Sequence, residues 1–162
     1  DYRDTARICP CGARGHLEAY ASAKGVIART EESVKEHPHS SLADRHRQGV
    51  ALTPRVVAEE AEAGDDLARR IVLDTARYLG IGIVSLIHTI DPDGVVLGGG
   101  MTFGGGQSAL GRSFLDTIRS EFRERTFPVL AERIAIEFAA LGSDAGYIGA
   151  AGLARKDANN DE

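Results

Sequence analysis

The sequence predicts an α/β domain that is rich in helices and has only a few strands. Apolar residues recur at helical spacing from residue 67 to about 90, which indicates a long and largely buried helix. Two short apolar runs, at residues 95–97 and 133–139, have the length and residue types of strands, and a strong turn signal at 91–94 precedes the first. With 162 residues, of which 43% are hydrophobic, the chain holds enough apolar material for one packed domain.

The first fifty residues predict a loop, a helix and a second loop. Residues 1–15 are polar and irregular, and their proline and glycines favour a tight loop. Residues 16–33 carry apolar side chains near helical spacing, so we expect one helix there, ended by the breaker cluster at 36–41. Residues 44–49 are charged and weakly patterned, and we expect a loop with one short turn.

Two further helices follow, each with a recognisable start. Thr53 and Pro54 suit the N-cap and the first position of a helix that ends at Gly64. An aspartate at position 65 or 66 then begins the long helix. Gly80 and Gly82 lie inside this helix, where each costs about 1 kcal/mol relative to alanine. We therefore expect another backbone to approach the helix closely at these glycines.

The chain after residue 97 predicts helices at about 110–125 and 142–154, separated by the strand at 133–139. Pro128 begins a short turn or helix before that strand. Residues 156–162 are charged, and we expect them to form a disordered tail after a domain that covers residues 1–155.

Composition and charge argue against several classes of function. The 24 acidic residues outnumber the 19 lysines and arginines, and the net charge of −5 argues against binding to nucleic acid. No uninterrupted apolar run approaches the roughly 20 residues of a membrane span, so we expect a soluble protein. Only two cysteines occur, one residue apart, which fits a reducing, cytoplasmic setting. The chain starts at Asp1 without a methionine, and we expect it to be part of a longer protein.

Three side chains near the N-terminus are chemically suited to a metal ion. Cys9, Cys11 and His16 place two thiolates and an imidazole around a glycine-rich turn. Zinc is usually four-coordinate and accepts both ligand types. Spacing alone favours a structural or incidental role for the cysteines over a metal site, and a zinc site would need a fourth ligand. The candidates for that ligand are His37, His39 and His46.

A run of three glycines follows the first predicted strand. Gly98, Gly99 and Gly100 leave the main chain bare, so that a phosphate or an adenine can approach it. The alternative is a flexible turn between a strand and a helix, and the glycines alone favour neither. A Walker A motif is absent, because no Gly-Lys-Ser or Gly-Lys-Thr follows. The Rossmann-like spacing at 104–109 stands several residues beyond the strand, so we reject it.

Several motifs, in a fixed order, carry a resemblance to one family. The segment 9–22, Cys-Pro-Cys-Gly-Ala-Arg-Gly-His-Leu-Glu-Ala-Tyr-Ala-Ser, resembles the signature C-x-C-G-x-x-G-C-x-E-x-x-x-S of the ROK family of sugar kinases and sugar-responsive repressors. The stretches 63–68, 78–83, 91–100 and 143–154 are similar to the segments that follow in family members. The resemblance covers about residues 8–154.

The resemblance implies roles for individual residues. In the family the signature cysteines bind a structural Zn²⁺ together with an upstream histidine, which implies a zinc site at Cys9, Cys11 and His16. His16 stands where the family has its third cysteine. The signature glutamate accepts hydrogen bonds from sugar hydroxyls, which implies that Glu18 binds the substrate; its alternative is an ordinary acidic residue near a helix start. The glycines at 98–100 match the loop that binds adenosine and phosphate.

The resemblance also implies a fold and an activity. The fold is the C-terminal part of an actin-like, ribonuclease-H-like ATPase domain. The parent protein uses ATP and Mg²⁺ to phosphorylate a hexose, with glucose as the expected substrate and a homo-oligomer as the expected assembly. The phosphate-binding motif D-x-G-x-T and the catalytic base lie upstream in the family and do not occur here, so we expect no catalytic residue in this chain. The alternatives are a sugar-responsive repressor and a non-catalytic, zinc-stapled sugar-binding or oligomerisation module.

Overall fold

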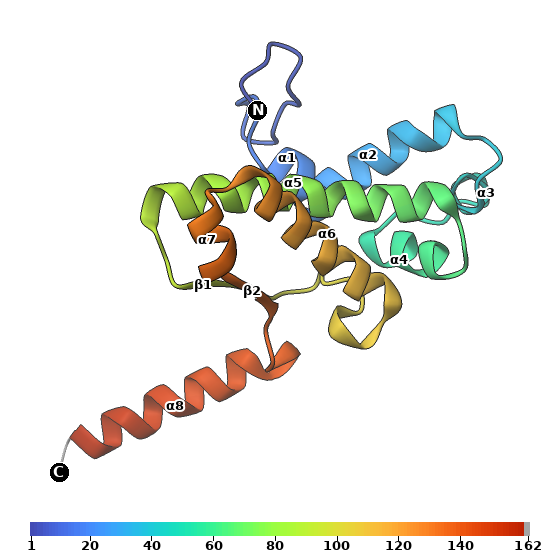
Figure 1. Ribbon diagram of the computed structural model, residues 1–162. Helices are drawn as coiled ribbons and strands as arrows, with labels where there is room; N and C mark the ends of the chain where they lie inside the picture. The colour runs from blue at the N-terminus through green and yellow to red at the C-terminus, as the bar shows by residue number, and fades with distance from the viewer. Residues whose placement is uncertain (161–162) are drawn as a thin grey trace.

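A computed structural model describes residues 1–160, in which several helices pack around one long central helix (Figure 1). The helices are α1 (Glu18–Ala21), α2 (Ala23–Glu36), α3 (Ser41–Arg47), α4 (Pro54–Glu62), α5 (Asp66–Ile90), α6 (Ala109–Arg125), α7 (Pro128–Arg133) and α8 (Ala145–Asn160). The strands are β1 (Gly94–Leu97) and β2 (Ala135–Phe138), and single 3-10 turns lie at η1 (Gly105–Gln107) and η2 (Gly142–Asp144). The predicted helix-rich α/β class is confirmed.

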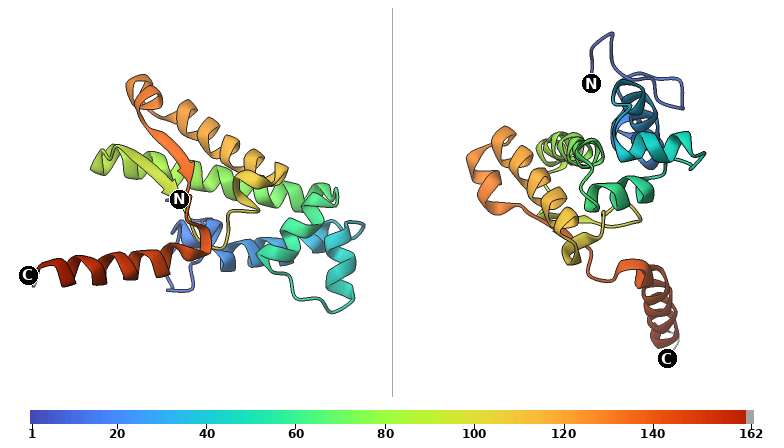
Figure 2. Two further views of the ribbon diagram at one scale, coloured as in Figure 1. Left: turned by 90° about the horizontal axis from the view of Figure 1, so that it is seen from below. Right: turned by 90° about the vertical axis from the view of Figure 1, so that its right-hand side faces the viewer.

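Helix α5 is the centre of the hydrophobic core. Asp65 caps its start, because the carboxylate accepts a 2.8 Å hydrogen bond from the backbone N–H of Ala68. Helices α1, α2, α4 and α6 all contact α5, and the views in Figure 2 show it running between them. The sequence contains no long uninterrupted apolar run, yet α5 as a whole is apolar enough to cross a membrane, with a mean hydropathy of 1.4 over 18 residues. Its nine buried residues make it a core helix.

The two glycines inside α5 lie at close contacts, but only one of them faces a backbone. A Cβ on Gly80 would lie 2.7 Å from Cβ of Glu121 and 3.0 Å from the carbonyl oxygen of Ile118, so α6 crosses α5 at this point. A Cβ on Gly82 would lie 2.5 Å from Cδ2 of Leu17, which is the tip of a side chain. The expected backbone approach is therefore confirmed at Gly80 and wrong at Gly82.

Strands β1 and β2 form a two-stranded parallel sheet. Gly94 pairs with Ala135 and Leu97 with Phe138. The sequence predicts a buried strand at 95–97, but exposed and half-buried residues alternate along β1, and Val96 is 73% exposed. The reason is that, within residues 1–160, β1 has one partner strand and the face that carries Val96 is uncovered.

Two predicted segments in the first fifty residues differ from the structure. Residues 16–33 do not form one helix, because Ser22 is extended and its hydroxyl accepts a 3.2 Å hydrogen bond from the backbone N–H of Gly25, which starts α2. The predicted loop at 44–49 is largely α3. Ser40 caps this helix, and burial of Leu42 stabilises it against the charged residues that follow.

Helix α8 extends away from the rest of the molecule (Figure 1, Figure 2). Its side chains at residues 145–156 are exposed, including Tyr147 and Leu153. The sequence predicts an end near residue 154, whereas α8 continues to Asn160, because no glycine or proline interrupts residues 153–160. The predicted disordered tail is thus helical as far as residue 160, and its last two residues lie outside the described part of the chain.

Candidate functional site

Main-chain hydrogen bonds shape residues 7–16 into a tight loop, here called the thiol loop. The backbone N–H of Gly12 donates to the carbonyl oxygen of Cys9 over 2.8 Å. Ile8 and Arg14 form an antiparallel bridge across the loop. Gly12 has a φ of +91°, which residues with a side chain rarely adopt. The predicted tight loop is confirmed.

The thiol loop brings two thiols and an imidazole together. The ligand atoms of Cys9, Cys11 and His16 lie within 4.8 Å of one another, and Sγ of Cys11 is 3.3 Å from Nδ1 of His16. Cys9 is buried and the other two residues are exposed. This donor set fits a zinc ion that takes a fourth ligand from elsewhere. Among the side chains that the structure describes, no fourth His, Cys, Asp or Glu belongs to the cluster, so the expected candidates His37, His39 and His46 are not brought in.

The environment of Cys9 favours its neutral thiol. A backbone hydrogen bond involving Cys11 lowers the pKa of Cys9. Desolvation, the Cys11 thiol and the Glu18 carboxylate together raise it by more, so the pKa lies above its ordinary value. A bound metal cation would oppose this shift, because the thiolate is the form that coordinates the ion. Glu18 follows His16 by two residues, so α1 begins directly after the cluster.

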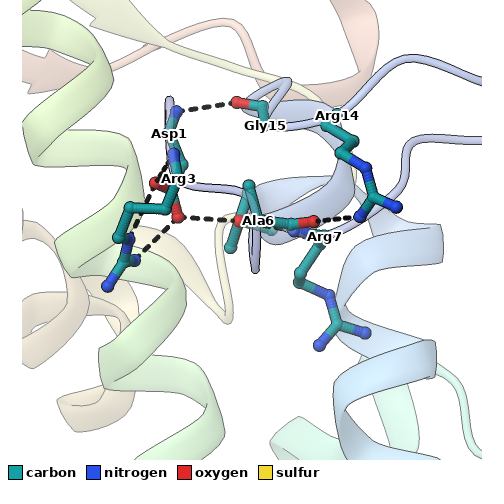
Figure 3. A network of polar contacts seen from close by, with 7 residues as sticks. Asp1, Arg3, Ala6, Arg7, Arg14 and Gly15 are labelled. Carbon is teal, nitrogen blue, oxygen red and sulfur yellow. Dashed lines mark hydrogen bonds and ion pairs between the residues drawn. The ribbon is translucent and has the colours of Figure 1, made fainter.

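Polar contacts join residues 1–6 to the end of the thiol loop, as Figure 3 shows. The backbone nitrogen of Asp1 donates a 2.9 Å hydrogen bond to the carbonyl oxygen of Gly15, and the guanidinium of Arg14 donates to the carbonyl oxygen of Ala6 over 3.3 Å. Arg3 donates two further hydrogen bonds to the carboxylate of Asp1. The segment before the thiol loop therefore supports the loop at Arg14 and Gly15.

Arg7 fastens the thiol loop to two helices. Its backbone N–H donates a 2.8 Å hydrogen bond to the hydroxyl of Tyr20 in α1. Its guanidinium forms two hydrogen bonds, of 2.7 and 2.8 Å, with the carboxylate of Glu32 in α2. This two-point ion pair lowers the pKa of Glu32 and raises that of Arg7.

Glu18 is the first residue of α1, and its side chain is exposed. The next two residues, Ala19 and Tyr20, are buried. Because α1 is a single turn, tertiary contacts must hold it in place. Gly25 of α2 provides one of them, since a Cβ there would lie only 2.8 Å from the carbonyl oxygen of Glu18. The backbone of α1 is thus fixed from behind while the carboxylate of Glu18 faces solvent.

The three glycines after β1 form an exposed stretch of main chain. Gly98, Gly99 and Gly100 are all exposed. Gly99 has a φ of +92°, and no heavy atom lies within 4 Å of a Cβ built at Gly99 or at Gly100. A tight turn explains the positive φ of Gly99. It does not require the open space beside Gly100, which leaves the main chain accessible to a ligand.

Arg29 of α2 carries contacts that no motif predicted. The structure buries it beside α1, and only 8% of its surface is exposed. Its neighbours along the helix, Val26 and Thr30, are fully buried. The signal that could have found it is an arginine three residues after Val26, on the face that the helix turns toward the core.

The fold is that of the C-terminal part of an actin-like ATPase domain, of the kind found in sugar kinases. A ROK family glucokinase from Streptomyces griseus, solved in complex with glucose and AMPPNP, matches with a TM-score of 0.74 and 27% identity over 96% of this chain and 49% of that protein. The ROK family matches residues 2–157, and the chain belongs to the ROK family.

Curated relatives include both kinases and regulators. The glucokinase of Halalkalibacterium halodurans is 37% identical over 155 residues, which cover 95% of this chain and 45% of the relative. The xylose repressor of Caldicellulosiruptor bescii is 26% identical over 153 residues, which cover 93% of this chain and 36% of the relative. The chain spans less than half the length of these relatives.

Proposed function

We propose that the full-length protein is an ATP-dependent hexokinase that phosphorylates glucose to glucose 6-phosphate. The observation that carries this proposal is the match, over 96% of the chain, to a glucokinase structure that holds glucose and AMPPNP. The relative that is 37% identical is a glucokinase as well. A structural and a sequence comparison thus support the same activity.

In this proposal the chain contributes one sugar contact and one nucleotide contact. Glu18 accepts hydrogen bonds from the sugar, because a carboxylate has several acceptor sites and can hold neighbouring hydroxyls. The open main chain at Gly98, Gly99 and Gly100 approaches the adenosine and the phosphates, where a side chain would intrude. Mg²⁺ bound with ATP offsets the charge of the phosphates. The chain contains no D-x-G-x-T motif, and we assign the catalytic base to the rest of the parent protein.

Zinc has a structural role in the proposal. Cys9, Cys11 and His16 hold the ion, which closes the thiol loop next to the helix that presents Glu18. The ion takes part in no step of phosphoryl transfer. We further propose that the protein acts in the cytoplasm, in keeping with its two free cysteines, and that it assembles as a homo-oligomer.

A coupled assay for ADP release tests the activity. The full-length protein is assayed with ATP, Mg²⁺ and a panel of hexoses, and we expect sugar-dependent turnover that is fastest with glucose. Turnover with another hexose alone would reject glucose, and no turnover with any hexose would reject the kinase. The 162-residue chain assayed alone is expected to be inactive, because phosphoryl transfer needs a base positioned on the acceptor hydroxyl.

A second candidate function is a sugar-responsive repressor of the same family. The observation that favours it is the similarity to a xylose repressor over 93% of the chain. Reading the parent sequence separates the two, because a repressor needs a DNA-binding helix-turn-helix and a kinase needs D-x-G-x-T. A full-length protein that binds sugar and duplex DNA without releasing ADP would be the repressor. A full-length protein that binds sugar but neither DNA nor ATP would be the non-catalytic module.

A further inference from the structure

Arg29 joins three helices at one buried point. Its Nε donates a 3.1 Å hydrogen bond to the carbonyl oxygen of Tyr20 at the end of α1. An Nη atom donates to the hydroxyl of Thr75 in the middle of α5. The guanidinium also lies over the ring of Tyr78, 5.3 Å from its centroid. One side chain of α2 therefore contacts both the short helix α1 and the central helix α5.

The charge of Arg29 is expensive to bury. Desolvation lowers the pKa of Arg29, and Asp74 and Glu32 oppose this only at longer range. Each of those carboxylates is bound to another arginine, and no carboxylate in the described part of the chain forms an ion pair with Arg29. Neutral acceptors and an aromatic ring hold the guanidinium instead. An apolar residue would avoid the cost of burying the charge, but it would leave the carbonyl oxygen of Tyr20, at the end of α1, without this donor. The contacts of Arg29 therefore tie the end of α1 to α2 and α5.

The group that Arg29 holds, Tyr20, is connected to the candidate site in two ways. Tyr20 lies two residues after Glu18 in a helix of one turn, so the position of its carbonyl sets the position of Glu18. Its ring packs with Cys9 and with Tyr78, with 4.8 Å between the two tyrosine ring centroids. Its hydroxyl accepts the hydrogen bond from the backbone of Arg7 in the thiol loop.

We infer that Arg29 is a positioning residue, which fixes α1 and the thiol loop to the central helix and so sets where Glu18 meets the sugar. The part of this inference that concerns the sugar rests on the proposed function. Arg29 acts through Tyr20 and does not itself touch the substrate. Arginine suits the role because its planar guanidinium donates in two directions at once, to α1 and to α5.

The test uses the full-length protein with Arg29→Lys and Thr75→Val, and with Arg55→Lys as the matched control. Lysine keeps the charge but has one nitrogen, which cannot bond both Tyr20 and Thr75 in the same geometry. Valine is branched at Cβ as threonine is, but it removes the hydroxyl that accepts from Arg29 and donates to the carbonyl oxygen of Ile71. Arg55 lies on the surface of α4 with its side chain 89% exposed and bonds only within its own helix, to Glu59.

Kinetics separate positioning from stability. Both variants are expected to raise KM for glucose about tenfold while KM for ATP stays within about twofold of wild type, because misplacing Glu18 affects the sugar alone. The control is expected to match wild type. A purely structural Arg29 would lower Tm and the active fraction, and hence kcat, with both KM values unchanged. That outcome would overturn the inference.

A second measurement does not depend on kinase activity. The alkylation rate of the buried Cys9 is followed by peptide mass spectrometry on metal-free, full-length protein, and we expect it to rise severalfold in Arg29→Lys but not in Arg55→Lys. Equal rates would overturn the link between Arg29 and the thiol loop. If wild type phosphorylates no hexose, the proposed function fails and Cys9 alkylation still decides the role of Arg29. If Arg29→Lys does not fold, the KM values and the Cys9 alkylation rate are measured on Thr75→Val instead.

Discussion

The contact between α1 and α2 at Gly25 gives a prediction that joins packing to sugar binding. A Cβ on Gly25 would lie 2.8 Å from the carbonyl oxygen of Glu18 and 2.9 Å from two backbone atoms of Ala19, whereas ordinary contacts begin at 3.4 Å. The obstacle is main chain, which cannot rotate away as a side chain does. In Gly25→Ala the helix α1 must therefore move by about 0.6 Å, the difference between 3.4 and 2.8 Å.

The energetic cost follows from two opposing effects. Overpacking of this kind costs about 1–3 kcal/mol, and alanine regains up to about 1 kcal/mol over glycine inside a helix. We expect Gly25→Ala to lower the free energy of unfolding by about 1–2 kcal/mol. Because the displaced carbonyl belongs to Glu18, we also expect KM for glucose to rise about tenfold, with KM for ATP unchanged.

Gly82→Ala is the matched control, since Gly82 also lies inside a helix at a short contact. Its new Cβ meets only the tip of Leu17, which can rotate, so we expect the free energy of unfolding to change by less than about 1 kcal/mol and KM for glucose to stay at the wild-type value. Urea unfolding and steady-state kinetics of the full-length variants provide both measurements. Equal stability and equal glucose KM in the Gly25→Ala and Gly82→Ala variants would refute this reasoning.

Three further substitutions test the candidate site in the full-length protein. Glu18→Gln removes a charge-assisted acceptor worth roughly 1.5–3 kcal/mol, so KM for glucose is expected to rise about ten- to a hundredfold with little change for ATP; an unchanged glucose KM would contradict the sugar role. Gly100→Val fills open space, and we expect KM for ATP to rise about tenfold at unchanged Tm. An unchanged KM for ATP would mean that the glycines only form a turn and do not bind the nucleotide. Gly99→Val is less informative, because the φ of +92° strains any side chain there. Cys9→Ser is expected to lower the zinc content from about one ion per chain to near zero, measured by elemental analysis of chelator-free protein, and zinc-free wild type would reject the site.

Short-range patterns made much of the chain predictable from the sequence. The start of α4 at Thr53 and Pro54 and the long helix after Asp65 depend on caps and on apolar spacing, which act within a few residues. The approach of Cys9, Cys11 and His16 is also local, because a tight loop spans the eight residues from the first ligand to the last. The same local reasoning failed at Ser22. Its extended backbone ends α1, and its hydroxyl caps the start of α2.

Only the tertiary structure decided how these local pieces are held. Arg29 and Thr75 are 46 residues apart, and no pattern in the sequence links them. The exposure of β1 depends on which strands and helices cover it. The apolar residues at 95–97 predict a strand, but they do not tell what packs against it. The close contact of Gly82 with Leu17, instead of with a backbone, depends on where α1 docks. Apolar spacing tells which side of an element is buried, whereas the partner on that side is chosen by packing between segments that are distant in the chain.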